Sequence, residues 1–163
     1  MSPQSKTLLI AAVIVILSKL LPYGSLLLYP ISLLSTWAHE MGHGIVAILT
    51  GGKFIELKIF YDTTGLAVTE PEMGVIGKVL IYNSGYLTTA TLGFFLLKFR
   101  FESEISSAIF LLIAGSIIFS QFFWVKELES HLLCIFLFIM MISLNRFKIE
   151  SELILNTIAL ALC

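Results

Sequence analysis

The feature that most constrains the fold is a series of long apolar runs that carry almost no charge. A helix needs about 20 apolar residues to cross the hydrocarbon core of a bilayer. Only 13% of the 163 residues are charged, roughly half the share of about 25% that covers a soluble domain. The sequence therefore predicts an all-α polytopic membrane protein of about five to six transmembrane helices. The runs cover residues 7–21, 26–50, 73–97, 105–125, 132–144 and 153–163.

The length of the chain and its charge define the kind of partner that we expect. All 163 residues fit one domain, residues 1–163. The net charge of −1 argues against a nucleic-acid partner, which needs a basic surface. The surroundings of the protein are then the lipid bilayer. The basic residues divide almost evenly between the two sides, so they assign no orientation, and the sequence indicates no oligomeric state.

Residues 53–70 differ from the apolar runs because polar and apolar side chains alternate along them. Alternation indicates strands, and Asp62 to Gly65 supply turn residues, so we expect a short β-hairpin between the second and third helices. Strict alternation places Phe54 on the face of Glu56, opposite Leu57. Open strand edges are not tolerated against lipid, so the hairpin is expected at the membrane interface or packed against the helices.

The second apolar run contains the sequence His39-Glu40-Met41-Gly42-His43. On a helix, residues four apart lie on one face, so His39 and His43 are candidate ligands of one Zn²⁺ ion. Glu40 is then the candidate general base, placed to take a proton from a water molecule that the zinc activates. Ionisable groups in a membrane helix are costly and usually functional. The alternative is that the three side chains satisfy one another at a helix–helix contact.

The residues around this motif carry a resemblance to a known family. Trp-Ala-His-Glu-Met-Gly-His-Gly at residues 37–44, with Ala-Ile-Leu-Thr-Gly-Gly at residues 47–52, resembles the site-2 protease family of intramembrane zinc metallopeptidases, in particular its short bacterial branch. Asn-Ser-Gly-Tyr-Leu at residues 83–87 also resembles that branch.

This resemblance implies zinc bound by His39 and His43, with Glu40 as the general base. It implies hydrolysis of peptide bonds in membrane protein substrates and a multi-pass location in a bacterial cell membrane. It also implies that the hairpin contacts the substrate, whose extended segment could pair with a free strand edge.

The sequence departs from the family at the third zinc ligand, which the family takes from an aspartate near Asp-Gly in a late span. Asp62, at the hairpin turn, is the one aspartate in the chain. Three sources of the ligand stay open: Asp62, His131 at the start of the fifth run, or an aspartate beyond Cys163 if the sequence is a fragment.

An incomplete ligand set would favour a second hypothesis, a catalytically inactive protein of the same fold that acts as a binding or scaffolding partner in the membrane. Asn83 is a further candidate, either for binding substrate or the developing oxyanion or for a helix–helix hydrogen bond.

Overall fold

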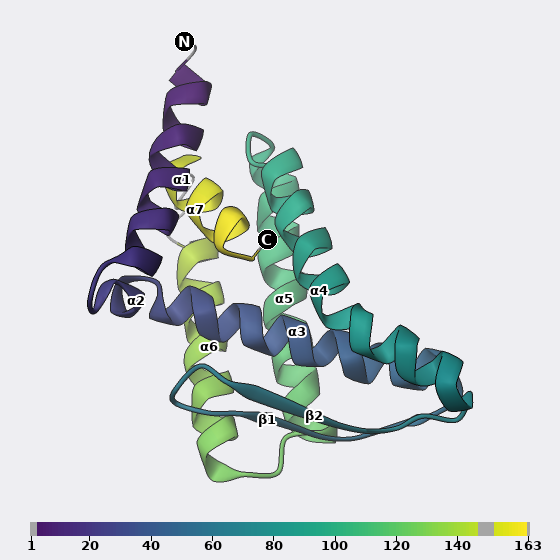
Figure 1. The fold of residues 1–163 in the computed structure, drawn as a ribbon. Helices are drawn as coiled ribbons and strands as arrows, with labels where there is room; N and C mark the ends of the chain where they lie inside the picture. Colours follow the sequence, from purple (N-terminus) through teal and green to yellow (C-terminus); the bar gives the residue numbers. More distant parts are fainter. Residues whose placement is uncertain (1–2, 147–151, 163) are drawn as a thin grey trace.

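The computed structural model describes residues 3–146 and 152–162 of the chain. This part is mostly helical and carries one two-stranded antiparallel hairpin, which lies between the second long helix and the third, as predicted. The elements, in chain order, are α1 (Pro3–Leu20), α2 (Gly24–Leu27), α3 (Tyr29–Leu49), β1 (Lys53–Ile59), β2 (Gly65–Glu70), α4 (Gly74–Lys98), α5 (Ser103–Phe123), α6 (Leu128–Arg146) and α7 (Glu152–Leu162) (Figure 1).

The second apolar run does not form a single helix alongside the others. It begins with the one-turn helix α2, and α3 starts at Tyr29 with a proline in its first turn, a position where a missing N–H costs nothing. In Figure 1, α3 runs across α5 and α6, and the hairpin extends along its length. The helix that carries the motif therefore lies across α5 and α6, with the hairpin along it.

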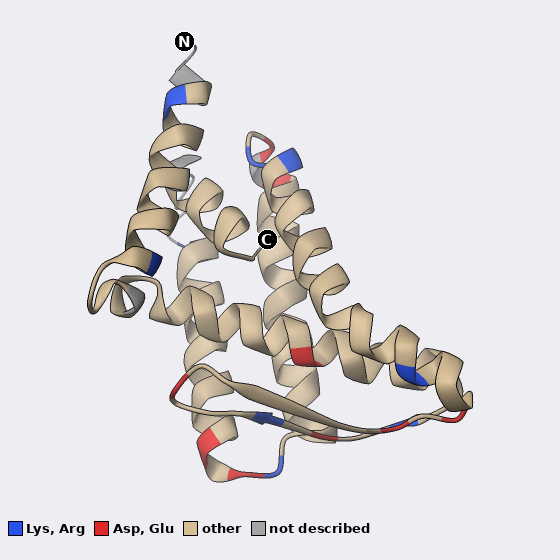
Figure 2. Ribbon diagram, in the orientation of Figure 1, with Lys and Arg blue, Asp and Glu red and all other residues tan. Residues whose placement is uncertain are grey.

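Helices α5 and α6 are long and apolar enough to cross a membrane, over Glu104–Phe123 and Leu128–Arg146. Only 33% and 28% of the most apolar stretches of these two helices are buried inside the protein. Most of their apolar surface therefore faces outward. Charged residues gather instead along the hairpin, at the α5–α6 connection and at the α4–α5 turn (Figure 2). Helix α7 has 11 residues, which is shorter than the about 20 that a span needs.

The hairpin contributes to the protein core through one face of β1. Leu57 and Ile59 are fully buried, and Phe54 is also buried. The strand pairing shifts between Phe54 and Glu56, which leaves Ile55 as an extra residue in a β-bulge. The bulge turns Phe54 to the same side as Leu57, so the strict alternation expected from the sequence is wrong at this point.

The buried Phe54 ring ties the hairpin to two neighbours. It stacks on Trp124, with 4.6 Å between ring centroids. It also lies directly against Gly44 of α3, where a Cβ atom would come within 2.1 Å of the ring. A residue larger than glycine at position 44 would therefore push the hairpin away from α3. Through this contact, the fold fixes the distance between the hairpin and the motif helix.

Candidate metal centre

The side chains of His39, Glu40 and His43 converge on one face of α3. Their ligand atoms all lie within 4.8 Å of one another, and all three residues are partly buried. The two imidazole rings meet edge to face, with centroids 4.6 Å apart. Helical spacing predicts this convergence, and two imidazoles with a neighbouring carboxylate form a donor set that suits zinc.

Helix α4 orients both histidines. His43 Nδ1 lies 2.6 Å from the Ile81 carbonyl oxygen. Because a carbonyl only accepts, Nδ1 carries the proton, which leaves Nε2 unprotonated and able to bind a metal. The His39 ring lies on Gly85, where a Cβ atom would come within 2.5 Å of Nε2, and Tyr86 meets the same ring edge to face at 4.7 Å. The close approach therefore requires glycine at position 85.

Strand β2 holds the carboxylate of Glu40. The backbone N–H of Ala67 donates a 2.7 Å hydrogen bond to Glu40 Oε2. Gly65 packs against the same side chain, since a Cβ atom there would lie 2.7 Å from Glu40 Cγ and 2.6 Å from Thr36 Cγ2. Thr36 Oγ1 donates a 2.6 Å hydrogen bond to the Thr63 carbonyl. Three contacts thus seat one end of the hairpin on the motif.

These elements border a small, open polar cavity of about 210 Å³. It is lined by Ser35, Thr36, His39, Glu40, Gly65 and Tyr86. A larger apolar cavity, of about 910 Å³, lies between α3, α4 and α5 and is lined by Ala38, Met41 and Ile45 of α3 among others. Helical spacing puts those three residues on the face of α3 opposite the histidines. Polar and apolar spaces therefore lie on opposite faces of the same helix.

The other sequence candidates lie apart from this group. Asp62 Oδ1 accepts hydrogen bonds from the backbone and hydroxyl of Thr64 at the hairpin turn, and the hydroxyl bond in particular lowers the pKa of Asp62. His131 Nδ1 lies 2.9 Å from Gln121 Oε1. Within residues 3–146 and 152–162, neither joins the metal-ligating group. The Asn83 amide donates to Val79 of its own helix.

Several residues of the site were not singled out by sequence reasoning. They are Thr36, Gly65, Ala67 and the Ile81 carbonyl. In α7, Asn156 is fully buried, and its amide has no hydrogen-bond partner within the described part of the chain. A buried amide without a partner is costly, and an asparagine in this largely apolar helix was the one sign in the sequence that position 156 is unusual.

A helix that brings two histidines and a glutamate together, with His39 and Glu40 lining a polar cavity, is typical of a metallopeptidase-type site. The family model described as Peptidase M50B-like matches residues 7–163. The chain belongs to this family, the site-2 proteases, whose members are membrane-embedded and typically metal-dependent. Comparison with curated proteins and with solved structures gives no match.

Proposed function

We propose that the protein is a zinc-dependent intramembrane metallopeptidase that hydrolyses peptide bonds of membrane-associated protein substrates. The observation that carries this proposal is the convergence of His39, Glu40 and His43 within 4.8 Å. His39 and His43 would hold the zinc, which when bound polarises the peptide carbonyl and makes water more acidic. The family match supports the same class of reaction.

The residues of the chain divide the remaining work. The carboxylate of Glu40 lines the small cavity and takes a proton from the attacking water, then passes it to the leaving amine. The hydrogen bond from His43 to Ile81 keeps the metal-binding nitrogen unprotonated. The cavity of about 210 Å³ admits a scissile bond rather than a folded domain, which fits an unfolded or membrane-extracted segment as substrate.

The membrane setting is part of the proposal. The outward apolar surface of α5 and α6 fits lipid, and we propose that α1 and α4 join them in a multi-pass domain that comprises residues 1–163. A bacterial cell membrane is the proposed location. The hairpin, at residues 53–70, is the proposed contact for an extended substrate segment.

The experiment compares metal content and turnover in the purified chain. We expect about one zinc per chain, lost in His39→Ala and in His43→Ala, because each removes one of the few direct bonds to the ion. Glu40→Gln keeps both histidines and should keep the zinc, while turnover of a membrane-embedded substrate falls by at least about 10²-fold with the loss of the base. A folded chain that binds no zinc would contradict the proposal.

One observation favours a second candidate, a catalytically inactive protein of the same fold that acts as a binding or scaffolding partner in the membrane. Neither Asp62 nor His131 joins the two histidines in the described part of the chain. Catalytic zinc sites usually have three protein ligands. Stoichiometric zinc without cleavage of any membrane substrate would support this candidate over the peptidase.

A further inference from the structure

The outer edge of β2 faces the motif helix, and the strand pairing shows which backbone groups it offers. Leu57 and Ala67 are direct partners in the antiparallel ladder. The Leu57 N–H points away from β2, because it donates to the Trp124 carbonyl at 2.9 Å. Directly paired residues in an antiparallel ladder share the same orientation. The Ala67 N–H therefore points away from β1, and the ladder does not use it.

The acceptor of this free N–H is Glu40 Oε2, at 2.7 Å. A peptide that adds to a strand edge places its carbonyl oxygen on such outward N–H groups. The carboxylate oxygen of Glu40 thus stands where the carbonyl oxygen of a paired peptide would stand. One N–H makes one strong hydrogen bond, so Glu40 and a peptide carbonyl compete for it.

The contact of Gly65 with Glu40 is a second, independent sign that this edge and the carboxylate occupy the same space. A Cβ atom at Gly65 would lie 3.2 Å from Glu40 Oε1. A peptide lying along β2 past Gly65 and Ala67 would meet both oxygens of the carboxylate. The side chain would have to turn away from the strand, toward the cavity that it lines with His39.

We propose that the hydrogen bond from the Ala67 N–H to Glu40, here called the latch, holds the carboxylate on the outer edge of β2. An extended peptide that pairs at Ala67 breaks this bond and turns the carboxylate into the cavity. This inference rests on the proposed peptidase function and adds a coupling to it. The general base is held on the strand when no substrate is paired, and the paired substrate itself frees the base. Binding of an extended segment and release of the general base from the strand are then the same event.

The test compares two variants that both lack the base and both keep the histidines. Glu40→Gln retains an amide oxygen that accepts from Ala67, whereas Glu40→Ala removes the competitor. A short fluorescein-labelled peptide rich in valine and threonine is titrated against each detergent-solubilised full-length variant, and anisotropy reports binding. We expect Glu40→Ala to bind about 3- to 10-fold more tightly, the range of one neutral hydrogen bond. Equal affinities, or weaker binding by Glu40→Ala, would overturn the latch.

Ala67→Pro is the matched control. It removes the outward N–H and no ladder bond, and proline is tolerated at an edge position of this kind. In this background the difference between the two Glu40 variants should shrink to within about 2-fold, because the shared donor is gone. A difference that persists would mean that Glu40 affects the peptide by another route, and the latch would be wrong.

Hydrogen exchange at the Ala67 amide gives a second measurement that does not depend on peptide affinity. Without peptide, this amide should exchange faster in Glu40→Ala than in Glu40→Gln, and added peptide should protect it in both. No protection by peptide would overturn the pairing. All of these variants lack the general base and none of the measurements uses turnover, so absence of activity in the natural chain would end the peptidase proposal and leave these results intact.

Discussion

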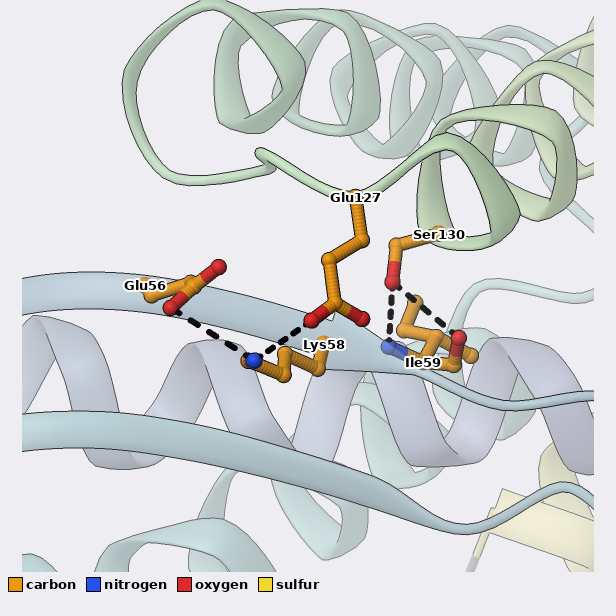
Figure 3. A network of polar contacts seen from close by, with 5 residues as sticks. All are labelled: Glu56, Lys58, Ile59, Glu127 and Ser130. Atoms are coloured by element: carbon orange, nitrogen blue, oxygen red, sulfur yellow. Dashed lines mark hydrogen bonds and ion pairs between the residues drawn. The ribbon is translucent and has the colours of Figure 1, made fainter.

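The two outer edges of the hairpin are held in different ways. The outer edge of β1 is bonded over its last three residues to the α5–α6 connection and the first turn of α6. The Leu57 N–H donates to Trp124, and the backbone N–H and carbonyl of Ile59 both bond Ser130 Oγ, at 2.9 and 3.1 Å. Lys58 adds an ion pair with Glu127 at 2.6 Å (Figure 3). Within the described part of the chain, the outer edge of β2 has one hydrogen bond at its centre, to the side chain of Glu40.

This difference separates an edge that the fold has closed from an edge that stays exchangeable. Unpaired strand edges invite pairing with other chains, and proteins usually cover them. The β1 edge is covered by backbone and by a buried serine that no incoming peptide can easily displace. The β2 edge is covered by the side chain of Glu40, the proposed general base, so displacing this side chain from the edge also changes the candidate site.

The largest expected effect comes from forcing the β2 edge away from Glu40. Gly65→Val would place side-chain atoms into Glu40 and Thr36, since even a Cβ atom would lie within 2.7 Å of both. A displaced β2 would pair the substrate farther from the base, so we expect turnover to fall about 10- to 100-fold, as misplacement by about 1 Å can cause. Zinc content should stay at the wild-type level because α4 holds the histidines. Leu66→Val, at the exposed neighbouring position, is the control. Unchanged turnover in Gly65→Val would show that the packing of β2 against Glu40 does not matter for the reaction.

A smaller effect, on stability rather than turnover, is expected at the β1 edge. Ser130→Ala leaves a buried N–H and carbonyl of Ile59 without their partner. Unsatisfied buried groups cost about 1–3 kcal/mol, which should appear as a lower unfolding midpoint in detergent. Turnover at low temperature should stay within about 2-fold of wild type. Ser116→Ala, at an exposed serine of α5, should leave the midpoint unchanged; if both variants unfold alike, the β1 edge contributes no more than any other surface.

The smallest expected effect concerns the ion pair on the same edge. The hydrogen bond to Glu127 raises the pKa of Lys58 above its ordinary value of 10.5. A raised pKa means that the paired, charged lysine stabilises the fold fully below pH 10.5, and that this contribution is lost as the pH rises through the raised pKa. Lys58→Met should therefore lower the unfolding midpoint slightly at neutral pH, by less than Ser130→Ala, and added salt should reduce the difference. If the difference in unfolding midpoint between wild type and Lys58→Met grew at high pH, the ion pair would not stabilise the fold in this way.

The sequence predicted those features that depend on local pattern. The motif at residues 39–43 and the hairpin at 53–70 were both predicted from spacing and alternation. The family resemblance, drawn from residues 37–52 and 83–87, is confirmed over most of the chain. The short bacterial branch and the zinc roles of His39, Glu40 and His43 stay predictions.

Features that depend on contacts between residues far apart in the chain could not be predicted from the sequence. Apolarity gives a helix no direction, so nothing indicated that α3 would lie across α5 and α6. The bulge at Ile55 follows from packing Phe54 between Gly44 and Trp124, and neither partner lies in the hairpin. The bond between Ala67 and Glu40 joins residues 27 positions apart, and a backbone N–H has no sequence signature at all.

The position of α3 also determines how water, the second reactant of the proposed hydrolysis, would reach the small cavity. Hydrolysis consumes water, which is scarce at the centre of a bilayer. The small cavity is lined by Gly65 of β2, and charged residues gather along the hairpin (Figure 2), so solvent can enter from the hairpin side without following the apolar lengths of α5 and α6. The proposed peptidase would then draw its water from one aqueous compartment while taking its peptide from the lipid phase.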